Sequence, residues 1–473
     1  MLRIPRFILA GLRGGSGKTI ISLGLARHFR NQKLNIKPFK KGPDYIDAVW
    51  LGRASGQTAT NLDPFLMSEP VLQALFQEQG QKAQLCLVEG NRGLFDGLDQ
   101  EGSFSTAALA RQLKAPVFLI LDCTKSTRTV AALVQGCQAF EPDLSLAGVI
   151  LNQTAGQRHR GILRQCLEKY TDLPVLGAVP KLGQTPIPER HMGLISDQEF
   201  QAEQALQTLG KVAEDCLDTE QIFRLAKQAA DLVPAQGRIW PNWTGAAEVN
   251  IAVVRDASLW FYYPENLEAL RRSGANIQEV SLLQAEPWPE IHGLYLGGGF
   301  PETQAQELSE NQAVRELVLR LARQGLPIYA ECGGLMYLCS TLTVSGQKFP
   351  MVGLFQADAE LCPKPQGHGY TRSKVVGRNP FHPQGLEFCG HEFHYSRCSF
   401  PTGQPQCSSL QMLRGKGLGQ AKDGLTVRNC FASYTHLHAL SVPSWAENFV
   451  RAAGKYKQAL EAGLQDCPDL EAK

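Results

Sequence analysis

The chain has 473 residues, enough for two or three domains of ordinary size. Its 47 Lys and Arg residues nearly balance its 45 Asp and Glu residues, which argues against a polybasic nucleic-acid binder. Apolar residues make up 43% of the chain, and no apolar run approaches a membrane span. The 13 cysteines form no Cys-x-x-Cys pair, which favours reduced thiols. We expect a cytoplasmic protein that binds neither nucleic acid nor membrane.

Residues 1–197 alternate short apolar runs with helix-like stretches. The strand-like runs are 6–10, 84–88, 117–122 and 146–151. Their nearly continuous hydrophobicity is typical of strands that helices cover on both faces. The alternation of such runs with helices predicts a mostly parallel α/β sheet.

A second α/β domain is predicted over residues 246–473. Before it, residues 198–245 combine helical spacing with a Pro/Gly/Trp-rich stretch, and we interpret them as a helical segment and linker. The strand pattern then restarts, with apolar runs at 250–254, 293–296 and 327–330 and a helical pattern at 309–324. Residues 343–430 are richer in turns, which favours antiparallel or irregular structure.

A glycine-rich loop, GLRGGSGKT over residues 11–19, follows the first predicted strand and precedes a predicted helix at 20–29. Such glycines allow backbone N–H groups to surround phosphate oxygens at a helix N-terminus. Lys18 is then expected to reach the β- and γ-phosphates, and the Thr19 hydroxyl to bind Mg²⁺. The alternative is a chance glycine-rich turn, which the coincidence of strand, loop and helix disfavours. The candidate phosphate-binding glycines are Gly14, Gly15 and Gly17.

Two loops offer carboxylates for a metal ion beside this nucleotide site. Asp44 and Asp47 lie in the segment KKGPDYID, and Glu89 and Asp96 lie in EGNRGLFD at the end of a predicted strand. Ligands of open α/β sheets gather at the carboxyl ends of strands, and Mg²⁺ prefers one or two carboxylates with phosphate and water. For Asp47 and Asp96, a turn or N-cap role is the alternative.

Cys332 has the sequence context of a nucleophile. It stands between a predicted strand and a predicted helix in PIYAECGGLMYL, and the helix N-terminus is expected to lower its pKa. The N–H of Gly333 is a candidate oxyanion donor. The earlier glycine loop GGGFPE contributes Gly298 and Gly299 as further candidate donors.

The base is expected from ASYTHLH, where His436 and His438 lie on one face of a possible strand. We favour His436 as the base of a Cys–His pair, and a metal pair or a polar surface strand is the alternative. The segment from Cys389 to Cys398 resembles a zinc site by composition. Zinc is disfavoured, because His391 and His394 point to opposite faces of an extended segment and the cysteine spacings fit no common motif.

Together these motifs resemble the glutamine-dependent cobyrinic acid a,c-diamide synthase family over nearly the whole chain. The motifs that carry the resemblance, in the family's order, are the phosphate-binding loop, FKKGPDYID, NLD, EGNRGLFDG, TKSTRT, GVILN, PERHMGL, GGGFPE, AECGGLMYL, GHEFHYS and ASYTHLH. The resemblance implies an α/β fold with two parts, an ATP-binding domain like dethiobiotin synthetase and a class I glutamine amidotransferase domain.

The same resemblance implies roles for single residues. Cys332 is implied as the glutaminase nucleophile with His436 as its base, Asp44 and Glu89 as Mg²⁺ ligands, and Asn152 as a contact of adenine. Many such enzymes read His-x-Glu where this chain reads His-Leu-His, so the resemblance assigns no third member of the triad.

The implied reaction is ATP-dependent amidation of the a and c acetate side chains of a corrin-type tetrapyrrole, through an acyl phosphate and ammonia from glutamine. Lys41 and the pair Asn91-Arg92 depart from the family pattern, so sirohaem or a sirohydrochlorin-type ring is the alternative substrate. The candidate substrate-binding residues are Lys40, Lys41, Asp47, Arg92, Asp96 and Arg190, and the alternative for the cations is a solvated surface.

Two alternatives come from other classes of protein. One is a regulatory P-loop ATPase with an inactive glutaminase-like module, which has no need for Cys332 with His436. The other is a plain cysteine hydrolase, which leaves the phosphate-binding loop unexplained. The sequence leaves the oligomeric state open.

Overall fold

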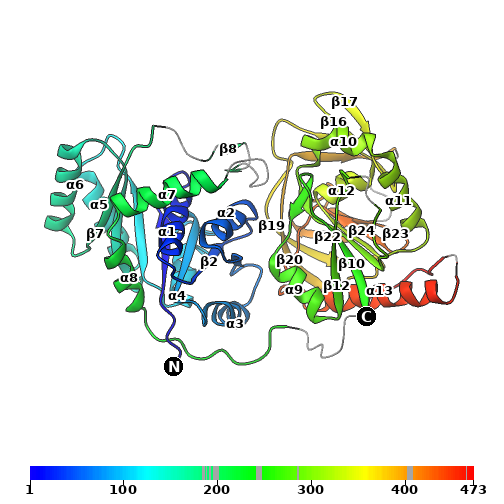
Figure 1. The fold of residues 1–473 in the computed structure, drawn as a ribbon, viewed down its shortest axis with the longest axis horizontal. Coiled ribbons are helices and arrows are strands. Elements are labelled where there is room, and N and C mark those ends of the chain that lie inside the picture. Colours follow the sequence, from blue (N-terminus) through cyan, green and yellow to red (C-terminus); the bar gives the residue numbers. More distant parts are fainter. Residues whose placement is uncertain are drawn as a thin grey trace. The chain divides into compact units, whose positions relative to one another are not determined.

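The structure is a computed structural model, and it divides into two compact units, Met1–Ile239 and Trp240–Lys473 (Figure 1). The residues described are 1–183, 187, 189–190, 193–194, 202–240, 248–284, 287–401, 408–464 and 466–472, with 189–190 and 193–194 described for their backbone alone. Within these ranges, no helix has the length and apolar character needed to cross a membrane.

The first unit is built on a seven-stranded sheet with the order β3-β2-β4-β1-β5-β6-β7. Every pairing between neighbouring strands of this sheet is parallel. The strands are β1 (Arg6–Gly11), β2 (Ile36–Lys41), β3 (Thr60–Leu62), β4 (Leu85–Gly93), β5 (Val117–Asp122), β6 (Leu146–Thr154) and β7 (Val175–Pro180). Two further short strands, β8 (Glu189–Arg190) and β9 (Gly193–Leu194), pair with each other. The parallel sheet predicted from the sequence is confirmed.

Helices cover both faces of this sheet. They are α1 (Lys18–Asn31), α2 (Ile46–Ser55), α3 (Glu69–Gly80), α4 (Thr106–Gln112), α5 (Thr129–Phe140), α6 (Gln157–Tyr170), α7 (Ala202–Cys216) and α8 (Thr219–Lys227). Helix α1 packs against α2 and α7, and α5 packs against α6 (Figure 1). The helical part of the segment 198–245 therefore packs on the first unit, where Phe29 of α1 meets Phe223 of α8.

The second unit contains a nine-stranded mixed sheet with the order β12-β10-β13-β15-β24-β23-β22-β19-β20. The first five strands are parallel, and the pairings from β24 to β20 are antiparallel. The strands of this sheet are β10 (Val249–Val254), β12 (Ala275–Val280), β13 (Gly293–Leu296), β15 (Ile328–Glu331), β19 (Gly367–Val375), β20 (Glu387–His394), β22 (Ser408–Arg414), β23 (Lys422–Val427) and β24 (Cys430–Ser433). The antiparallel character expected for residues 343–430 is confirmed.

Two smaller sheets and several helices complete the second unit. The smaller sheets comprise β11 (Leu259–Phe261) with β14 (Gly298–Gly299), and β16 (Cys339–Val344), β17 (Gln347–Pro350), β18 (Phe355–Leu361) and β21 (Ser396–Ser399). The helices are α9 (Pro264–Arg272), the 3₁₀ helix η1 (Pro301–Gln304), α10 (Ala305–Glu310), α11 (Gln312–Arg323), α12 (Gly333–Leu338) and α13 (Ser444–Glu461). The single helix expected at 309–324 is two helices, separated at Asn311, whose side chain donates to Leu282 O.

A buried arginine joins three parts of the first unit. Arg6 of β1 is 0% exposed, and its guanidinium donates to the carbonyl oxygens of Ile4, Leu113, Lys114 and Ala230 at 2.5–3.0 Å. Burial lowers the pKa of Arg6 to about 10, so the group stays protonated at neutral pH. Its loss would leave several buried carbonyl groups without a donor.

We expect Arg6→Met to lower the local free energy of opening of β1 and β5 by about 3 kcal/mol, because buried acceptors lose a charged donor. Hydrogen exchange of the full chain measures this, with β10 and β13 of the second unit as an internal reference. The matched control is Arg3→Met, since exposed Arg3 makes one long hydrogen bond, to Lys227 O at 3.3 Å. Equal protection in the two variants would contradict the role of Arg6.

Candidate functional site

The loop between β1 and α1 has the backbone conformation of a phosphate-binding loop. Gly15 and Gly17 have φ values of 72° and 88°, a region that residues with a Cβ disfavour. A Cβ on Gly17 would lie 2.1 Å from Asn152 Nδ2, and the same amide donates to Ser16 O at 2.9 Å. The surroundings of Gly14 are open. Asn152 on β6 therefore holds the loop through its backbone, and its contact with adenine remains a prediction.

Lys18, the first residue of α1, connects the loop to the end of β4. Its ammonium donates to Arg13 O at 3.0 Å and to Arg92 O at 2.8 Å. Burial lowers the pKa of Lys18, and the negative charge of Glu89 opposes this shift. Phosphate oxygens are chemically suited to replace these two carbonyl acceptors.

An acidic cluster lies next to Lys18 at the carboxyl ends of β2 and β4. Its centre is the buried ammonium of Lys40, which is 2.5 Å from Asp47 Oδ2, 2.7 Å from Glu89 Oε1 and 3.6 Å from Asp44 Oδ2. The Thr19 hydroxyl donates to Glu89 Oε1 at 2.8 Å. The sequence placed these side chains in three separate segments, and the parallel sheet brings them together.

Burial and the charges within this cluster raise the pKa values of some of its carboxyl groups and lower that of another. Burial and the neighbouring Asp47 raise the pKa of Asp44 to about 7. Burial also raises the pKa of Glu89, against the effect of Lys40. For Asp47, burial acts upward, but the ion pair and hydrogen bond with Lys40 outweigh it and lower the pKa. The carboxylates hold the pKa of Lys40 well above its usual range despite burial.

The donor set suits a hard cation that takes most of its ligands from elsewhere. In the described part of the chain, no group of three or more His, Cys, Asp or Glu residues is arranged to hold a metal by itself. Glu89 Oε2 is buried, however, and has no hydrogen-bond partner among the described residues. One or two carboxylates, Glu89 with Asp44 on the same Lys40 ammonium, together with the Thr19 hydroxyl fit Mg²⁺ that also binds phosphate oxygens and water.

The residues predicted to bind substrate fall into different environments. Lys40 is 2% exposed and Lys41 is 5% exposed, so neither is a solvated surface cation. Burial lowers the pKa of Lys41, with Asp63 acting in the opposite direction. Arg92 is exposed and has a φ of 53°, a strained value for a residue with a side chain.

Asp47, in the first turn of α2, and Asp96 both have partners within the protein. Asp47 belongs to the acidic cluster, and Asp96 Oδ2 accepts from Gly93 N at 3.0 Å in a turn. Arg190 lies in β8, and its side chain is outside the described residues, as is most of the motif 188–194.

In the second unit, Cys332 forms a strained turn between β15 and α12. Its φ and ψ values are 46° and −95°, a strained conformation that residues with a side chain rarely adopt and that occurs at nucleophile elbows. A Cβ on Gly334 would lie 2.6 Å from Leu296 O, and a Cβ on Gly333 would lie 3.1 Å from Gly299 N. The turn thus requires glycine, and it brings the backbone of Gly333 close to that of Gly299, another predicted oxyanion donor.

The expectation that the helix N-terminus lowers the pKa of Cys332 is wrong. Burial raises the pKa of this thiol well above its usual range, and the charges of Glu302 and Glu331 add to the effect. A hydrogen bond from Gly333 N–H opposes the shift but is outweighed. Helix α12 has six residues, so its contribution is small beside the cost of burying a thiolate. The thiol therefore needs a base.

The two histidines of ASYTHLH do not lie on one strand. Strand β24 ends at Ser433, because Asp423 accepts the next two backbone N–H groups at 3.1 and 3.0 Å. His436 Nδ1 lies 3.4 Å from Glu331 Oε2, whereas His438 Nε2 lies 3.6 Å from Glu265 Oε2. The prediction that both rings share one face of a strand is wrong, and each ring instead faces its own buried carboxylate.

The zinc alternative for residues 389–398 receives no support from the geometry. His391 stacks on His436 with ring centroids 4.8 Å apart, and His394 stacks on Tyr434 at 3.7 Å. The two rings thus lie in separate environments, as expected for an extended segment. In the described part of this segment, no three His, Cys, Asp or Glu side chains converge on one point.

Glu331 is the residue of this site that the sequence analysis missed. Its carboxylate is 0% exposed and accepts from Leu437 N at 3.1 Å and from Tyr295 Oη at 3.3 Å. The available signal was an acid at the end of a buried strand, directly before the predicted nucleophile. Periodicity alone does not distinguish such an acid from the end of a strand at the surface.

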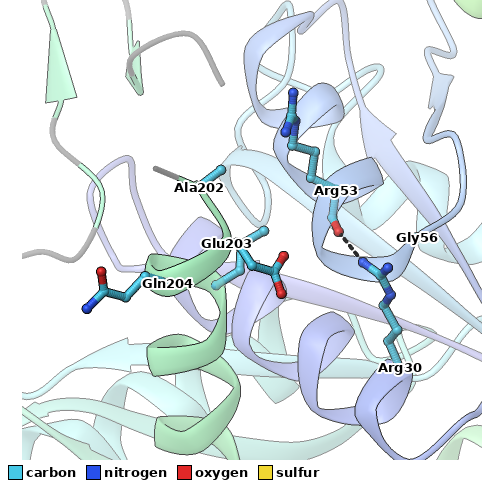
Figure 2. A pocket seen from close by; sticks show the side chains of 7 residues that line it. Arg30, Arg53, Gly56, Ala202, Glu203 and Gln204 are labelled. Atoms are coloured by element: carbon cyan, nitrogen blue, oxygen red, sulfur yellow. Dashed lines mark hydrogen bonds between the residues drawn. The ribbon is translucent and has the colours of Figure 1, made fainter. Parts of the chain in front are cut away.

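An open pocket of about 800 Å³ in the first unit lies apart from these groups. Figure 2 shows that α1, α2 and α7 line it, and that Arg30 donates to Arg53 O, at 2.8 Å. Glu203 at its edge pairs with Arg27. Among the side chains that the structure describes, none of those predicted to bind nucleotide, metal or substrate lines this pocket.

Each of the two units matches a known protein family. The family described as CobQ/CobB/MinD/ParA nucleotide binding domain matches residues 7–194, and the CobB/CobQ-like glutamine amidotransferase domain matches residues 250–443. A cobyrinate a,c-diamide synthase of Magnetococcus marinus is 40% identical over 96% of this chain and 99% of its own length. The chain belongs to the cobyrinate a,c-diamide synthase family.

Further members of the cobyrinate a,c-diamide synthase family show the same extent of similarity. The enzyme of Listeria monocytogenes is 37% identical over 92% of this chain and 96% of its own length. The enzyme of Salmonella typhimurium is 37% identical over 94% of this chain and 98% of its own length. The chain is thus an enzyme, a ligase with a nucleotide-binding domain and a glutamine amidotransferase domain, which disfavours the regulatory ATPase and the plain hydrolase.

The close approach of Gly298 to His436 predicts that a methyl group there disables glutamine use. A Cβ on Gly298 would lie 2.5 Å from His436 Cε1, so Gly298→Ala must displace the ring. We expect about a hundredfold loss of glutamine-dependent rate, as for other displaced catalytic groups, with ammonia-dependent rate retained. The matched control is Gly454→Ala on α13, where the nearest atom would be 3.9 Å away. Normal glutamine kinetics in Gly298→Ala would contradict the placement of His436.

Proposed function

We propose that the chain catalyses ATP- and glutamine-dependent amidation of the a and c acetate carboxylates of a corrin-type tetrapyrrole. The main support is that one chain holds both sites. Its first unit has a phosphate-binding loop with an acidic cluster, and its second unit has a strained cysteine elbow near a buried histidine. Relatives over more than nine-tenths of the chain bear the name cobyrinate a,c-diamide synthase.

In the second unit, the proposed reaction is hydrolysis of glutamine through a thioester. His436 takes the thiol proton of Cys332, and the sulfur attacks the side-chain amide carbon of glutamine. The N–H groups of Gly333 and of Gly298 or Gly299 are the proposed donors to the resulting oxyanion. The protonated ring of His436 then passes its proton to the leaving nitrogen, releasing ammonia, and water cleaves the thioester to give glutamate.

In the first unit, a substrate carboxylate oxygen attacks the γ-phosphorus of ATP, which forms an acyl phosphate and releases ADP. Ammonia then attacks the acyl carbon and phosphate leaves, giving the amide. Lys18 and the N–H groups of the glycine loop bind the transferred phosphoryl group. Thr19, Glu89 and Asp44 would hold Mg²⁺, which supplies positive charge to the phosphate oxygens when bound.

Recognition of an anionic ring is the proposed role of the cations near the ends of β2 and β4. Lys41 is buried, and the charges of Arg92 and Lys40 both act on its ammonium. A carboxylate brought next to Lys41 and Arg92 would relieve this mutual repulsion, which favours an acidic substrate. The further proposed substrate residues are Lys40 of β2, Asp47 of α2, Arg190 of β8 and Asp96.

Two variants separate the two half-reactions. We expect Cys332→Ala to abolish glutamine use and to keep ammonia-dependent amidation, because only the nucleophile is lost. We expect Lys18→Ala to abolish amidation with either nitrogen source, because acyl-phosphate formation precedes attack by ammonia. Rates of ADP release and amide formation with each nitrogen source measure both effects. The control is Cys362→Ala, a partly exposed cysteine of the second unit.

The same experiment can contradict the role assigned to Cys332 and the role assigned to the phosphate-binding loop separately. Parental glutamine hydrolysis by Cys332→Ala would remove Cys332 as the nucleophile. Amidation with ammonia by Lys18→Ala would remove the assigned phosphate-binding loop.

The choice of ring is tested by incubating the protein with ATP, glutamine and a panel of tetrapyrroles, and by following acid-to-amide conversion by mass spectrometry. We expect cobyrinate to be converted twice, at the a and c side chains. Conversion of sirohaem or a sirohydrochlorin-type ring in preference to cobyrinate would instead select the alternative substrate. Failure of every acidic ring would contradict the proposed function.

A further inference from the structure

We propose that Glu331 is the positioning residue of the glutaminase site: its carboxylate orients the ring of His436 and stabilises that ring once it has taken the proton of Cys332. The proposal rests on the proposed function, in which Cys332 and His436 act as nucleophile and base. It supplies the third member that the sequence pattern His-Leu-His leaves without an acid.

The distances support this arrangement. Glu331 Oε2 lies 3.4 Å from His436 Nδ1, which leaves Nε2 as the nitrogen available to the thiol. The backbone of His436 is fixed by an antiparallel bridge with His391, with N–O distances of 2.8 and 3.1 Å. Ring and carboxylate are thus both held by backbone elements, as an orienting pair requires.

The carboxylate is itself held by two donors. Leu437 N donates to Oε1 at 3.1 Å, and Tyr295 Oη donates to Oε2 at 3.3 Å. Burial and the charge of Glu331 raise the pKa of Tyr295 well above its usual range, so the phenol remains a donor. Asn266 Nδ2 in turn donates to Tyr295 Oη at 3.1 Å. A residue adjacent to His436 therefore anchors the same carboxylate that faces its ring.

The charges also suit proton transfer within the site. A carboxylate that is 0% exposed is costly unless it has donors or a cation. The charge of Glu331 is one cause of the raised pKa of Cys332, so the thiol keeps its proton until glutamine arrives. Once the proton moves to His436, the same negative charge lies next to a positive ring, which it stabilises.

Around His436 the structure also describes the carboxylates of Asp423 and Glu265, and both have other partners: Asp423 accepts from Tyr434 N and Thr435 N, and Glu265 faces His438. His391 stacks on the ring of His436, and burial together with the charges of His436 and His438 lowers the pKa of His391 well below its usual range. Tyr263 Oη lies 3.4 Å from His391 Nδ1. Glu265, on α9, lies 3.6 Å from His438 Nε2. Glu265 therefore offers a matched carboxylate–histidine pair that the proposal leaves outside the reaction.

The test compares Glu331→Gln with Glu265→Gln in the full chain. We expect Glu331→Gln to reduce the glutamine-dependent kcat about 10³–10⁴-fold, with KM for glutamine and ammonia-dependent amidation unchanged. The acid limb of the glutaminase pH profile should move to lower pH, because loss of the carboxylate disfavours the protonated ring. Glu265→Gln should remain within about threefold of the parent.

A double-variant cycle shows whether Glu331 acts through His436. We expect His436→Ala and the double variant His436→Ala/Glu331→Gln to hydrolyse glutamine at the same residual rate, because the carboxylate has no ring left to orient. If Glu331 had a purely structural role, Glu331→Gln would lower the rate by the same factor in the parent and in the His436→Ala variant. That result would overturn the proposal. Glutamine turnover by Glu331→Gln within about threefold of the parent would overturn it equally.

Folding is followed in parallel by hydrogen exchange of β13, β15 and β24. If Glu331→Gln loses this protection, Glu331→Asp replaces it as the decisive variant. Aspartate keeps the carboxylate but is one methylene shorter, so this variant should lower kcat about 10–100-fold. The acid limb of its glutaminase pH profile should stay at the parental pH. Glutamine turnover by Glu331→Asp at the parental rate would overturn the proposal. So would a variant that loses hydrogen-exchange protection but keeps its rate of glutamine turnover. Persistent glutamine hydrolysis by Cys332→Ala would instead overturn the proposed function itself.

Discussion

A fully buried carboxylate in each unit requires a nearby cation or hydrogen-bond donor, and the side chains of both sites are arranged around that requirement. Glu89 and Glu331 are each 0% exposed. Glu89 is compensated by the ammonium of Lys40 and the Thr19 hydroxyl. Glu331 accepts hydrogen bonds from a tyrosine and a backbone N–H, and the ring of His436 lies 3.4 Å away. Because an unpaired buried charge costs several kcal/mol, these partners are needed to keep each carboxylate inside the protein.

Both carboxylates are placed by the same property of parallel sheets. Glu89 lies within β4 and Glu331 ends β15, so each is positioned where its strand approaches the carboxyl edge of the sheet. Neighbouring parallel strands deliver Lys40 from β2 and the glycine loop after β1 to the same edge. In the second unit, β15 pairs with β24, whose continuation carries His436. Side chains from distant segments therefore meet without long connections.

The turns where these strands end have strained backbone angles. Gly15 and Gly17 take left-handed backbone angles in the phosphate-binding loop, while Arg92 and Cys332 take them despite their side chains. Burial keeps the thiol of Cys332 protonated in the absence of substrate, so its reactivity depends on a base rather than on a lowered pKa. In the proposed reaction, the strained turn positions the thiol and His436 accepts its proton.

The sequence by itself determined the two α/β units, the phosphate-binding loop and the cysteine elbow, because strand hydrophobicity and glycine spacing are local signals. It also indicated Lys18, Thr19 and Glu89 through motifs. Only the tertiary structure decided that Lys40 lies among three carboxylates, that burial raises the pKa of Cys332, and that His436 and His438 face different acids. These facts depend on which strands become neighbours in the sheet and on how far water is excluded from the side chains. The spacing of residues within one segment determines neither of them.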